Sequence, residues 1–204
     1  KRYDVPWREL EKKGFVAEAH CIEVRIPLPP ALAVEYELAE MRHKIRISAE
    51  NPLKMAVVRD LLARHGKDKI LIIGMYIDQL ETVAKLFKAP LITGKTPNDE
   101  RDRLYDLFRR GDIHVLTVSK VANFSINLPD ANVAIQLSGT FGSRQEEAQR
   151  LGRILRPSGT DSHFYSVVTR SSREQEFAHN RQLFLTEQGY SYAIEEWEPS
   201  AADL

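Results

Sequence analysis

Three polar side chains near residue 150 have the types and the spacing that phosphate chemistry uses. Gln149, Arg153 and Arg156 are four and three residues apart, so a helix would place them on one face. A guanidinium is planar and always charged, and it can therefore stabilise the charge that builds up on a phosphoryl group during its transfer. The same spacing also describes the solvated face of an ordinary amphipathic helix, and by itself it favours that second interpretation.

The residues just before this set predict the helix that would position it. Ser143 and Glu146 form a capping-box pattern, which is typical of a helix start. Pro157 disfavours helical geometry at the residue before it, so we expect Arg156 on the last turn. A second face of the helix is apolar and could pack on a sheet; it comprises Ala148, Leu151 and Leu155.

The surrounding sequence alternates between short apolar runs and amphipathic helices. A continuous apolar run such as residues 70–73 is typical of a strand that is buried on both faces. Strands that alternate with helices of this length predict an α/β fold with a parallel sheet and right-handed crossovers. The expected strands are 70–73, 91–92, 115–118, 133–136 and 164–168, and the expected helices are 52–65, 80–87, 97–110 and 172–188.

The two ends of the chain have a different character from this central pattern. We expect residues 1–50 to be an N-terminal lead that packs on the main domain, residues 51–195 to form that domain, and residues 196–204 to be a flexible tail. Within the lead, the pattern predicts helices at 7–13 and 31–41 and a strand at 21–26, whereas 42–50 is too polar for a prediction.

Composition excludes several classes of function. The formal net charge is zero, so no overall positive field indicates nucleic acid. A single cysteine, Cys21, excludes an internal disulfide and a thiolate metal cluster. The six histidines lack metal-ligand spacing, so we predict no metal site. No apolar run approaches the roughly 20 residues of a membrane span, and we expect no membrane association.

Ligands of parallel α/β sheets bind at the carboxyl ends of the strands, which draws attention to the loops there. One of these loops, Gly94-Lys95-Thr96, resembles the end of a phosphate-binding Walker A loop. The first glycine of that motif would fall at position 89, which is alanine, so the cradle cannot form. A single phosphate, such as one of a nucleic-acid backbone, still suits this loop. With no nucleophile, general base or phosphate loop, the sequence predicts half of an active site.

Taken in order, the segments resemble the second, C-terminal RecA-like domain of superfamily 2 helicases, and most closely that of the XPB-type DNA repair helicases. The Gln-x-x-Gly-Arg-x-x-Arg pattern at 149–156 is similar to motif VI of that superfamily. The other similar segments are 70–80 (motif IV), 92–101 (a loop and helix beside the DNA backbone), 115–129 (motif V), 138–146, 164–169 and 177–192. The resemblance implies a RecA-like, P-loop NTPase-like sheet that lacks its own Walker A.

The resemblance also implies a role for each matched residue in the nucleotide site. Arg153 and Arg156 would be arginine fingers, and Gln149 would position the phosphates or the attacking water. Gly152 would allow close helix packing beside the nucleotide, and Asn127 would contact ATP. The family usually has Asp at position 127; the amide of Asn127 can hydrogen-bond but carries no charge.

For DNA, the resemblance implies contacts from the loops of motifs IV and V and from the loop between them. These residues are Gly74, Tyr76, Thr93, Gly94, Lys95, Thr96, Thr117, Ser119 and Lys120.

The expected function is that of the C-terminal lobe of an ATP-dependent DNA helicase or translocase of 3′-to-5′ polarity. ATP and Mg²⁺ would be held mainly by an N-terminal RecA-like lobe of the same polypeptide, so the fragment alone is expected to be inactive. Expected partners are DNA, that lobe and a repair nuclease, in the cytoplasm with the chromosomal DNA. The alternative is a catalytically inactive module that binds DNA or a repair-nuclease partner.

Overall fold

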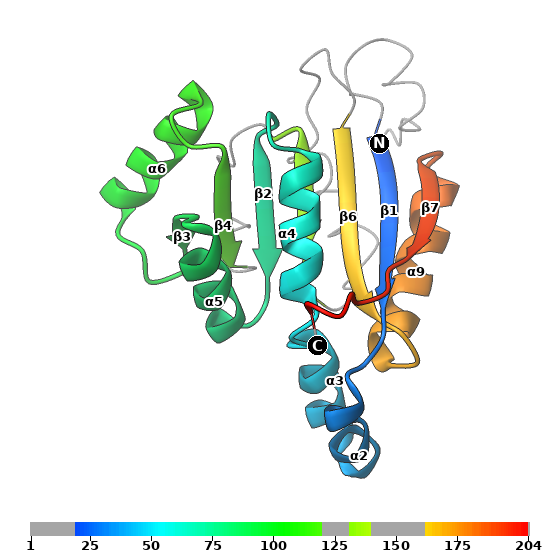
Figure 1. Ribbon diagram of the computed structural model, residues 1–204. Helices are drawn as coiled ribbons and strands as arrows, with labels where there is room; N and C mark the ends of the chain where they lie inside the picture. Colours follow the sequence, from blue (N-terminus) through cyan, green and yellow to red (C-terminus); the bar gives the residue numbers. More distant parts are fainter. Residues whose placement is uncertain (1–18, 120–130, 140–161, 204) are drawn as a thin grey trace, which may run out of the picture.

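The computed structural model describes residues 19–119, 131–139 and 162–203. Within these residues, seven strands form one sheet in the order β3-β4-β2-β5-β6-β1-β7, and all neighbouring strands are parallel (Figure 1). The strands are β1 (Ala19–Ile26), β2 (Ile70–Gly74), β3 (Leu91–Ile92), β4 (Val115–Ser119), β5 (Val133–Gln136), β6 (Ser162–Thr169) and β7 (Ser191–Glu196). The predicted fold class, a parallel sheet flanked by helices, is confirmed.

Helices cover both faces of the sheet. On one face, α4 and α5 pack against Ile70, Ile72 and their neighbours; on the other, α6 and α9 pack against Leu71 and Ile73. These four consecutive residues of β2 are each 2% exposed or less, as the continuous apolar run predicts. The described helices are α2 (Pro30–Leu38), α3 (Met41–Ala49), α4 (Lys54–Arg64), α5 (Ile77–Phe87), α6 (Asn98–Arg110) and α9 (Arg173–Glu187).

The strand expected at 21–26 is confirmed as β1, and it lies inside the sheet, between β6 and β7. The sheet therefore takes one of its interior strands from the segment that we expected to be a lead. At this end of the sheet, Tyr192 of β7 donates a hydrogen bond of 2.6 Å to the buried carboxylate of Glu23 in β1. Burial, together with this carboxylate, raises the pKa of the Tyr192 phenol, which therefore remains a donor.

Two elements were not predicted, α3 and β7. The α3 segment is polar, and contacts with other elements hold it: the carbonyl of Ser48 accepts from Thr169 and that of Ala49 from Gln79. Strand β7 lies at the edge of the sheet and most of its side chains are exposed, so it lacks the apolar run that marks the interior strands.

Residues after β7 make contacts with α4. The indole of Trp197 donates to the Asp60 carboxylate at 3.0 Å. The guanidinium of Arg59 donates to the Asp203 carboxylate at 2.8 Å. Hydrogen bonds from Ser200 and from this guanidinium lower the pKa of Asp203 to about 2. These contacts join part of the expected tail to the main body of the chain.

Candidate functional site

Seven of the residues singled out from the sequence lie at or just beyond the carboxyl ends of β2, β3 and β4, and an eighth, Thr117, lies in the middle of β4. Gly74 and Ser119 are paired in the parallel register of β2 and β4, and Ile92 at the end of β3 is paired with Val118. The sheet therefore brings these three strand ends to one edge, which we call the carboxyl edge. The remaining residues fall outside the described part of the chain: Lys120, Asn127, Gln149, Gly152, Arg153 and Arg156, with the predicted helix that starts after Ser143.

At the end of β2, Gly74 allows a close approach between neighbouring elements. A Cβ atom there would lie 2.7 Å from Leu80 Cδ2 and 3.2 Å from Ser138 Oγ. Glycine therefore lets α5 and the segment that leaves β5 approach this strand end. The buried position of Gly74 gives it a packing role at the carboxyl edge.

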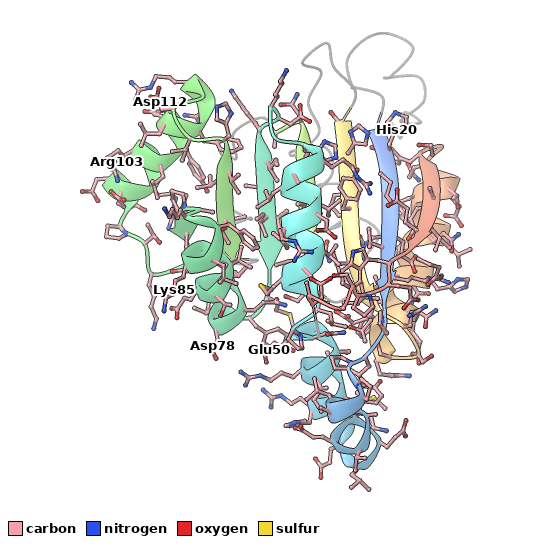
Figure 2. All side chains as sticks on the ribbon, viewed as in Figure 1. His20, Glu50, Asp78, Lys85, Arg103 and Asp112 are labelled. Carbon is pink, nitrogen blue, oxygen red and sulfur yellow. The ribbon has the colours of Figure 1, made fainter. Side chains whose placement is uncertain are left out.

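Tyr76 is the N-cap of α5, and its ring contacts α3. The guanidinium of Arg46 lies over its ring, 5.5 Å from the centroid, a distance at which a cation–π interaction is favourable. Arg46 also pairs with Glu50 at 2.5 Å and with Asp78 at 3.3 Å; Figure 2 shows Glu50 and Asp78 close together at this edge. Partial burial raises the pKa of the Tyr76 phenol. The unpredicted helix α3 is therefore part of the surroundings of the site.

The loop after β3 is held by its own threonines. The backbone N–H of Thr93 donates to Thr96 Oγ1 at 2.9 Å, and that of Lys95 donates to Thr93 Oγ1 at 3.2 Å. Arg101 in α6 donates to the carbonyl of Thr96 at 3.2 Å. The hydroxyl of Thr96 thus closes the loop and does not cap the following helix, whose N-cap is Pro97. Gly94 and Lys95 are exposed at the tip, where an ammonium group can reach a phosphate.

Thr117 and Ser119 in β4 are buried, with exposed fractions of 0% and 2%. The hydroxyl of Thr117 has no hydrogen-bond partner in the structure. Among the residues expected to contact DNA, the exposed loop tip at Gly94 and Lys95 is therefore accessible to a ligand, whereas the side chain of Thr117 is not.

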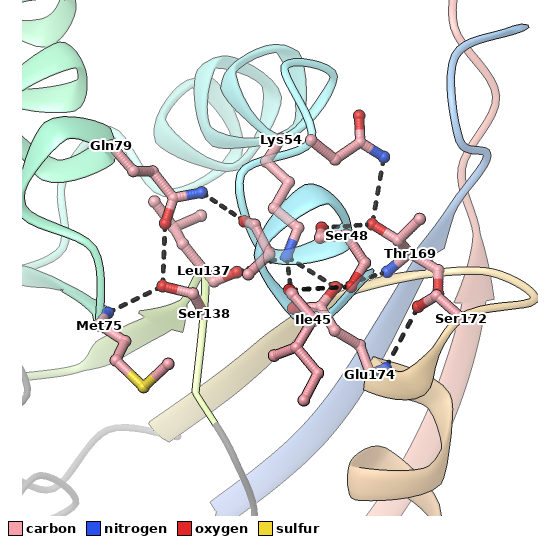
Figure 3. Close-up of polar contacts among 12 residues, drawn as sticks. Ile45, Ser48, Lys54, Met75, Gln79, Leu137, Ser138, Thr169, Ser172 and Glu174 are labelled. Atoms are coloured by element: carbon pink, nitrogen blue, oxygen red, sulfur yellow. Dashed lines mark hydrogen bonds and ion pairs between the residues drawn. The ribbon is translucent and has the colours of Figure 1, made fainter. Parts of the chain in front are cut away.

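A buried ion pair behind the carboxyl edge was missed from the sequence. Lys54 of α4 is 0% exposed, and its Nζ lies 2.9 Å from both carboxylate oxygens of Glu174 in α9 (Figure 3). The same Nζ donates to the carbonyl of Leu137 at 2.5 Å, and Glu174 also accepts from the backbone N–H of Thr169. Burial lowers the pKa of Lys54 and raises that of Glu174, while each partner opposes the shift of the other. The sequence does contain a signal, because Lys54 shares the apolar face of α4 with Val57, Val58 and Leu61.

A second group of buried contacts lies beside this pair. Ser138 Oγ accepts from the backbone N–H of Met75 at 2.8 Å and donates to Gln79 Oε1 at 2.9 Å. The amide of Gln79 in turn donates to the carbonyl of Ala49, at the end of α3, at 2.7 Å. Gln79 is 6% exposed and Ser138 is 4% exposed. The chain that leaves β5 is therefore bound at two successive residues. Lys54 of the ion pair binds the carbonyl of Leu137, and Gln79 and the N–H of Met75 bind the hydroxyl of Ser138.

Comparison with known protein families agrees with this arrangement. Residues 10–201 match the model of the ERCC3/RAD25/XPB C-terminal helicase family. This chain belongs to that family. It is 53% identical over 196 residues to the DNA 3′-5′ helicase XPB of Kineococcus radiotolerans and 52% identical over 196 residues to that of Mycobacterium tuberculosis. Each alignment covers 95% of this chain but only 35% and 36%, respectively, of the relative, so the chain spans about a third of their length.

Solved structures support the RecA-like fold of this XPB-family domain. The C-terminal domain of the DEAD-box protein Dbp5 superposes with a TM-score of 0.63 at 16% identity, covering 86% of this chain and 90% of that one. The E. coli DEAD-box protein SrmB superposes with a TM-score of 0.57 at 16% identity, covering 87% and 91%. At this identity the likeness concerns the fold.

At the opposite edge of the sheet, which we call the amino edge, the strands of this XPB-family domain begin. A cluster of aromatic rings lies there. The ring of His163 lies 5.2 Å from that of His20 and 5.1 Å from that of His65, centroid to centroid. His65, the last residue of the helix expected at 52–65, is the C-cap of α4. Its ring is hydrogen-bonded to Asp68 at 2.9 Å and to the Tyr165 hydroxyl at 2.8 Å. A cavity of about 530 Å³ is lined by these rings.

Neither a metal site nor a membrane span emerges from the described residues. In ranges 19–119, 131–139 and 162–203, no group of three or more His, Cys, Asp or Glu side chains could hold a metal ion. In the same ranges, every helix is too short or too polar to cross a bilayer.

Proposed function

We propose that this chain is the second lobe of an ATP-dependent DNA helicase or translocase of 3′-to-5′ polarity, and that its arginines complete an ATP site formed by a preceding lobe. The observation that carries the proposal is the match of residues 10–201 to a C-terminal helicase family, in a sequence with no phosphate loop of its own. The relatives named DNA 3′-5′ helicase XPB extend well beyond the region that this chain matches. A lobe that follows a nucleotide-binding one needs to supply only part of the site.

In this proposal the preceding lobe binds ATP with Mg²⁺, which neutralises part of the phosphate charge. Closure of the two lobes brings Arg153 and Arg156 to the γ-phosphate, where their fixed charge stabilises the transition state. Gln149, on the same predicted helix face, orients the phosphates or the attacking water. Asn127 contributes a hydrogen bond to the nucleotide, and Gly152 lets the helix approach it.

DNA contact is proposed at the tip of the loop after β3. Gly94 and Lys95 are exposed there, and hydrogen bonds from Thr93, Thr96 and Arg101 fix the loop. Tyr76, which is partly exposed, would extend this surface along the carboxyl edge, and Lys120, which follows β4 in the sequence, is a further proposed DNA contact. A contact with phosphate positions the protein but reads no sequence. We therefore expect weak sequence preference and strong dependence on salt.

The finger assignment is tested by Arg156→Ala in a polypeptide that also contains the preceding lobe. Turnover of ATP should fall about 10³–10⁵-fold, the range known for arginine fingers, while ATP affinity is retained. Arg103→Ala is the control, because Arg103 is exposed on α6 and pairs with Glu100. Unchanged turnover in Arg156→Ala would refute the assignment.

The DNA surface is tested by Lys95→Ala in the same polypeptide. Loss of one phosphate contact should weaken binding about equally for all sequences and reduce the salt slope by about one. Binding titrations at several salt concentrations measure both effects. Lys85→Ala, an exposed lysine on α5, is the control; an equal loss in the control would mean that the effect comes from general charge.

The alternative is a module without catalytic activity that binds DNA or a repair nuclease. A specific observation favours a protein partner: Val34, Leu38 and Met41 of the projecting helices α2 and α3 are 69%, 83% and 51% exposed (Figure 1). Under this alternative, Arg156→Ala leaves ATP turnover of the longer polypeptide unchanged. An assay of residues 1–204 alone adds a second criterion, since DNA-stimulated ATPase activity there would refute a split site. In both cases we expect the protein inside the cell, with the chromosomal DNA.

A further inference from the structure

The two residues that follow β5, Leu137 and Ser138, are hydrogen-bonded to side chains of other elements. The carbonyl of Leu137 accepts a hydrogen bond of 2.5 Å from Lys54 Nζ. The hydroxyl of the next residue, Ser138, is bonded to the N–H of Met75 and to Gln79. The backbone N–H of Leu137 also donates to the carbonyl of Ile73 at 2.8 Å. Two successive residues are thus fixed by a charged group, an amide and a neighbouring strand.

These contacts are buried and joined to the ends of other elements. Glu174 pairs with Lys54 and accepts from Thr169 at the end of β6, whose hydroxyl donates to the carbonyl of Ser48 in α3. Asn51 donates to the Thr169 hydroxyl at 3.1 Å and to the carbonyl of Pro27, after β1, at 2.9 Å. A displacement of the β5 exit would therefore leave buried polar groups without hydrogen-bond partners, which is unfavourable away from water.

The position of these contacts in the sequence gives them a functional meaning. Gly139 is the last described residue before 140–161, the segment that carries Gln149, Arg153 and Arg156. The direction in which the chain leaves Ser138 sets where that segment starts. In phosphoryl transfer the protein acts mainly by positioning charge, and a misplacement of about 1 Å can cost about 10²-fold in rate.

We propose that Gln79 and the Lys54–Glu174 pair are positioning residues for ATP hydrolysis, because they fix Leu137 and Ser138 at the base of the arginine-bearing segment. This inference rests on the proposed function. They act through the backbone of the β5 exit and do not touch the nucleotide. Gln79 is the better probe, since replacing it leaves no unpaired charge in the interior.

The test uses a polypeptide that includes the preceding lobe and compares Gln79→Met with Ser138→Ala. Methionine keeps the length of glutamine without its polar atoms, and alanine removes the hydroxyl that joins Gln79 to Met75. We expect kcat at saturating ATP to fall about tenfold or more in each variant, with ATP and DNA affinities within about twofold of the parent. The control is Thr82→Ala on the same helix, because the exposed hydroxyl of Thr82 bonds only to Asp78 of its own helix turn.

A merely structural role is separated by the double variant Gln79→Met with Ser138→Ala. The double variant leaves two groups without a partner, the N–H of Met75 and the carbonyl of Ala49, which is the same number as each single variant leaves. The loss of melting temperature in the double variant should therefore be smaller than the sum of the two single losses. Turnover should nevertheless remain low. Recovery of turnover together with stability, or unchanged turnover in both stable single variants, would overturn the positioning role.

Combination with Arg156→Ala separates this inference from the proposed function. If Gln79 acts by placing the arginine segment, Gln79→Met should lower turnover much less in the Arg156→Ala background than in the parent. Equal, multiplicative losses would show that Gln79 acts by another route and would refute the inference while the finger assignment stands. Unchanged turnover in Arg156→Ala alone would refute the proposed function itself.

Discussion

The two edges of the sheet hold polar groups in different ways. At the carboxyl edge, Lys54 and Glu174 carry opposite charges at 0% and 7% side-chain exposure, and their partners come from several elements. At the amino edge, imidazole and phenol groups meet around a cavity that is also lined by an exposed ion pair: Arg64 and Glu195 lie 3.2 Å apart at 52% and 43% side-chain exposure. Figure 2 places His20 at this second edge, far from Glu50 and Asp78 at the first.

This difference indicates which edge is built to hold a fixed geometry. A buried ion pair is costly to break, because the remaining charge lacks both water and a partner. A side-chain hydrogen bond such as that between His65 and Tyr165 costs less to remove, and an exposed ion pair costs almost nothing. By this argument the carboxyl edge, where the candidate site lies, holds its geometry more firmly than the amino edge. Each of the following substitutions tests this order.

The largest loss of stability is expected for Lys54→Met. The substitution leaves the carboxylate of Glu174 buried without its cation, which should lower the free energy of unfolding by about 3–5 kcal/mol. Denaturant titration measures this change. Adding Glu174→Leu should recover much of the loss, and Lys85→Met on α5 should stay within about 0.5 kcal/mol of the parent. A loss of less than 1 kcal/mol in Lys54→Met would show that the pair does not hold this edge.

An intermediate loss is expected for His65→Phe at the amino edge. The substitution keeps an aromatic ring, although a larger one, and removes the hydrogen bonds to Asp68 and to the hydroxyl of Tyr165. A buried hydroxyl that loses a partner costs about 1–3 kcal/mol. Adding Tyr165→Phe to this variant should recover part of the lost free energy of unfolding, because it removes the hydroxyl that has lost its partner. Equal coupling energies in the Lys54–Glu174 and His65–Tyr165 double-mutant cycles would contradict the claim that the carboxyl edge is held more firmly than the amino edge.

The smallest loss is expected for Arg64→Ala. Its pair with Glu195 is exposed, and exposed pairs contribute about 0–1 kcal/mol, decreasing with added salt. Thermal unfolding at low and high salt measures the effect, with Glu195→Ala as the partner variant. A loss above 2 kcal/mol would place Arg64 among the groups that hold the amino edge together.

Much of the fold could be predicted because the interior strands and helices follow simple patterns. The continuous apolar residues 70–73 lie in β2, and Gly111, which follows the helix expected at 97–110, is the C-cap of α6 with a φ of 81°. The sequence could not show that β1 enters the sheet between β6 and β7, because strand order depends on contacts between distant residues. Strand β7 was missed because its exposed positions carry no apolar run.

The candidate site was predicted less completely than the fold. The strand-end rule selected the loop at Gly94 and Lys95, and the structure places this loop at the carboxyl edge. Thr117 matched a motif, but its position in the middle of β4 buries it. Glu174 and Gln79 were missed because local sequence does not reveal a partner that lies more than 50 residues away.

The place of β1 in the sheet has a consequence for the order in which the chain can fold during synthesis. β1 ends at Ile26, yet its neighbours β6 and β7 begin only at Ser162 and Ser191. As the chain emerges from the ribosome, the apolar side chains Ile22, Val24 and Ile26 of β1 are synthesised long before the strands β6 and β7 with which β1 pairs. A strand without its neighbours can pair with the wrong strand or with another chain. We therefore expect nascent chains that end before β6 to depend most on a chaperone.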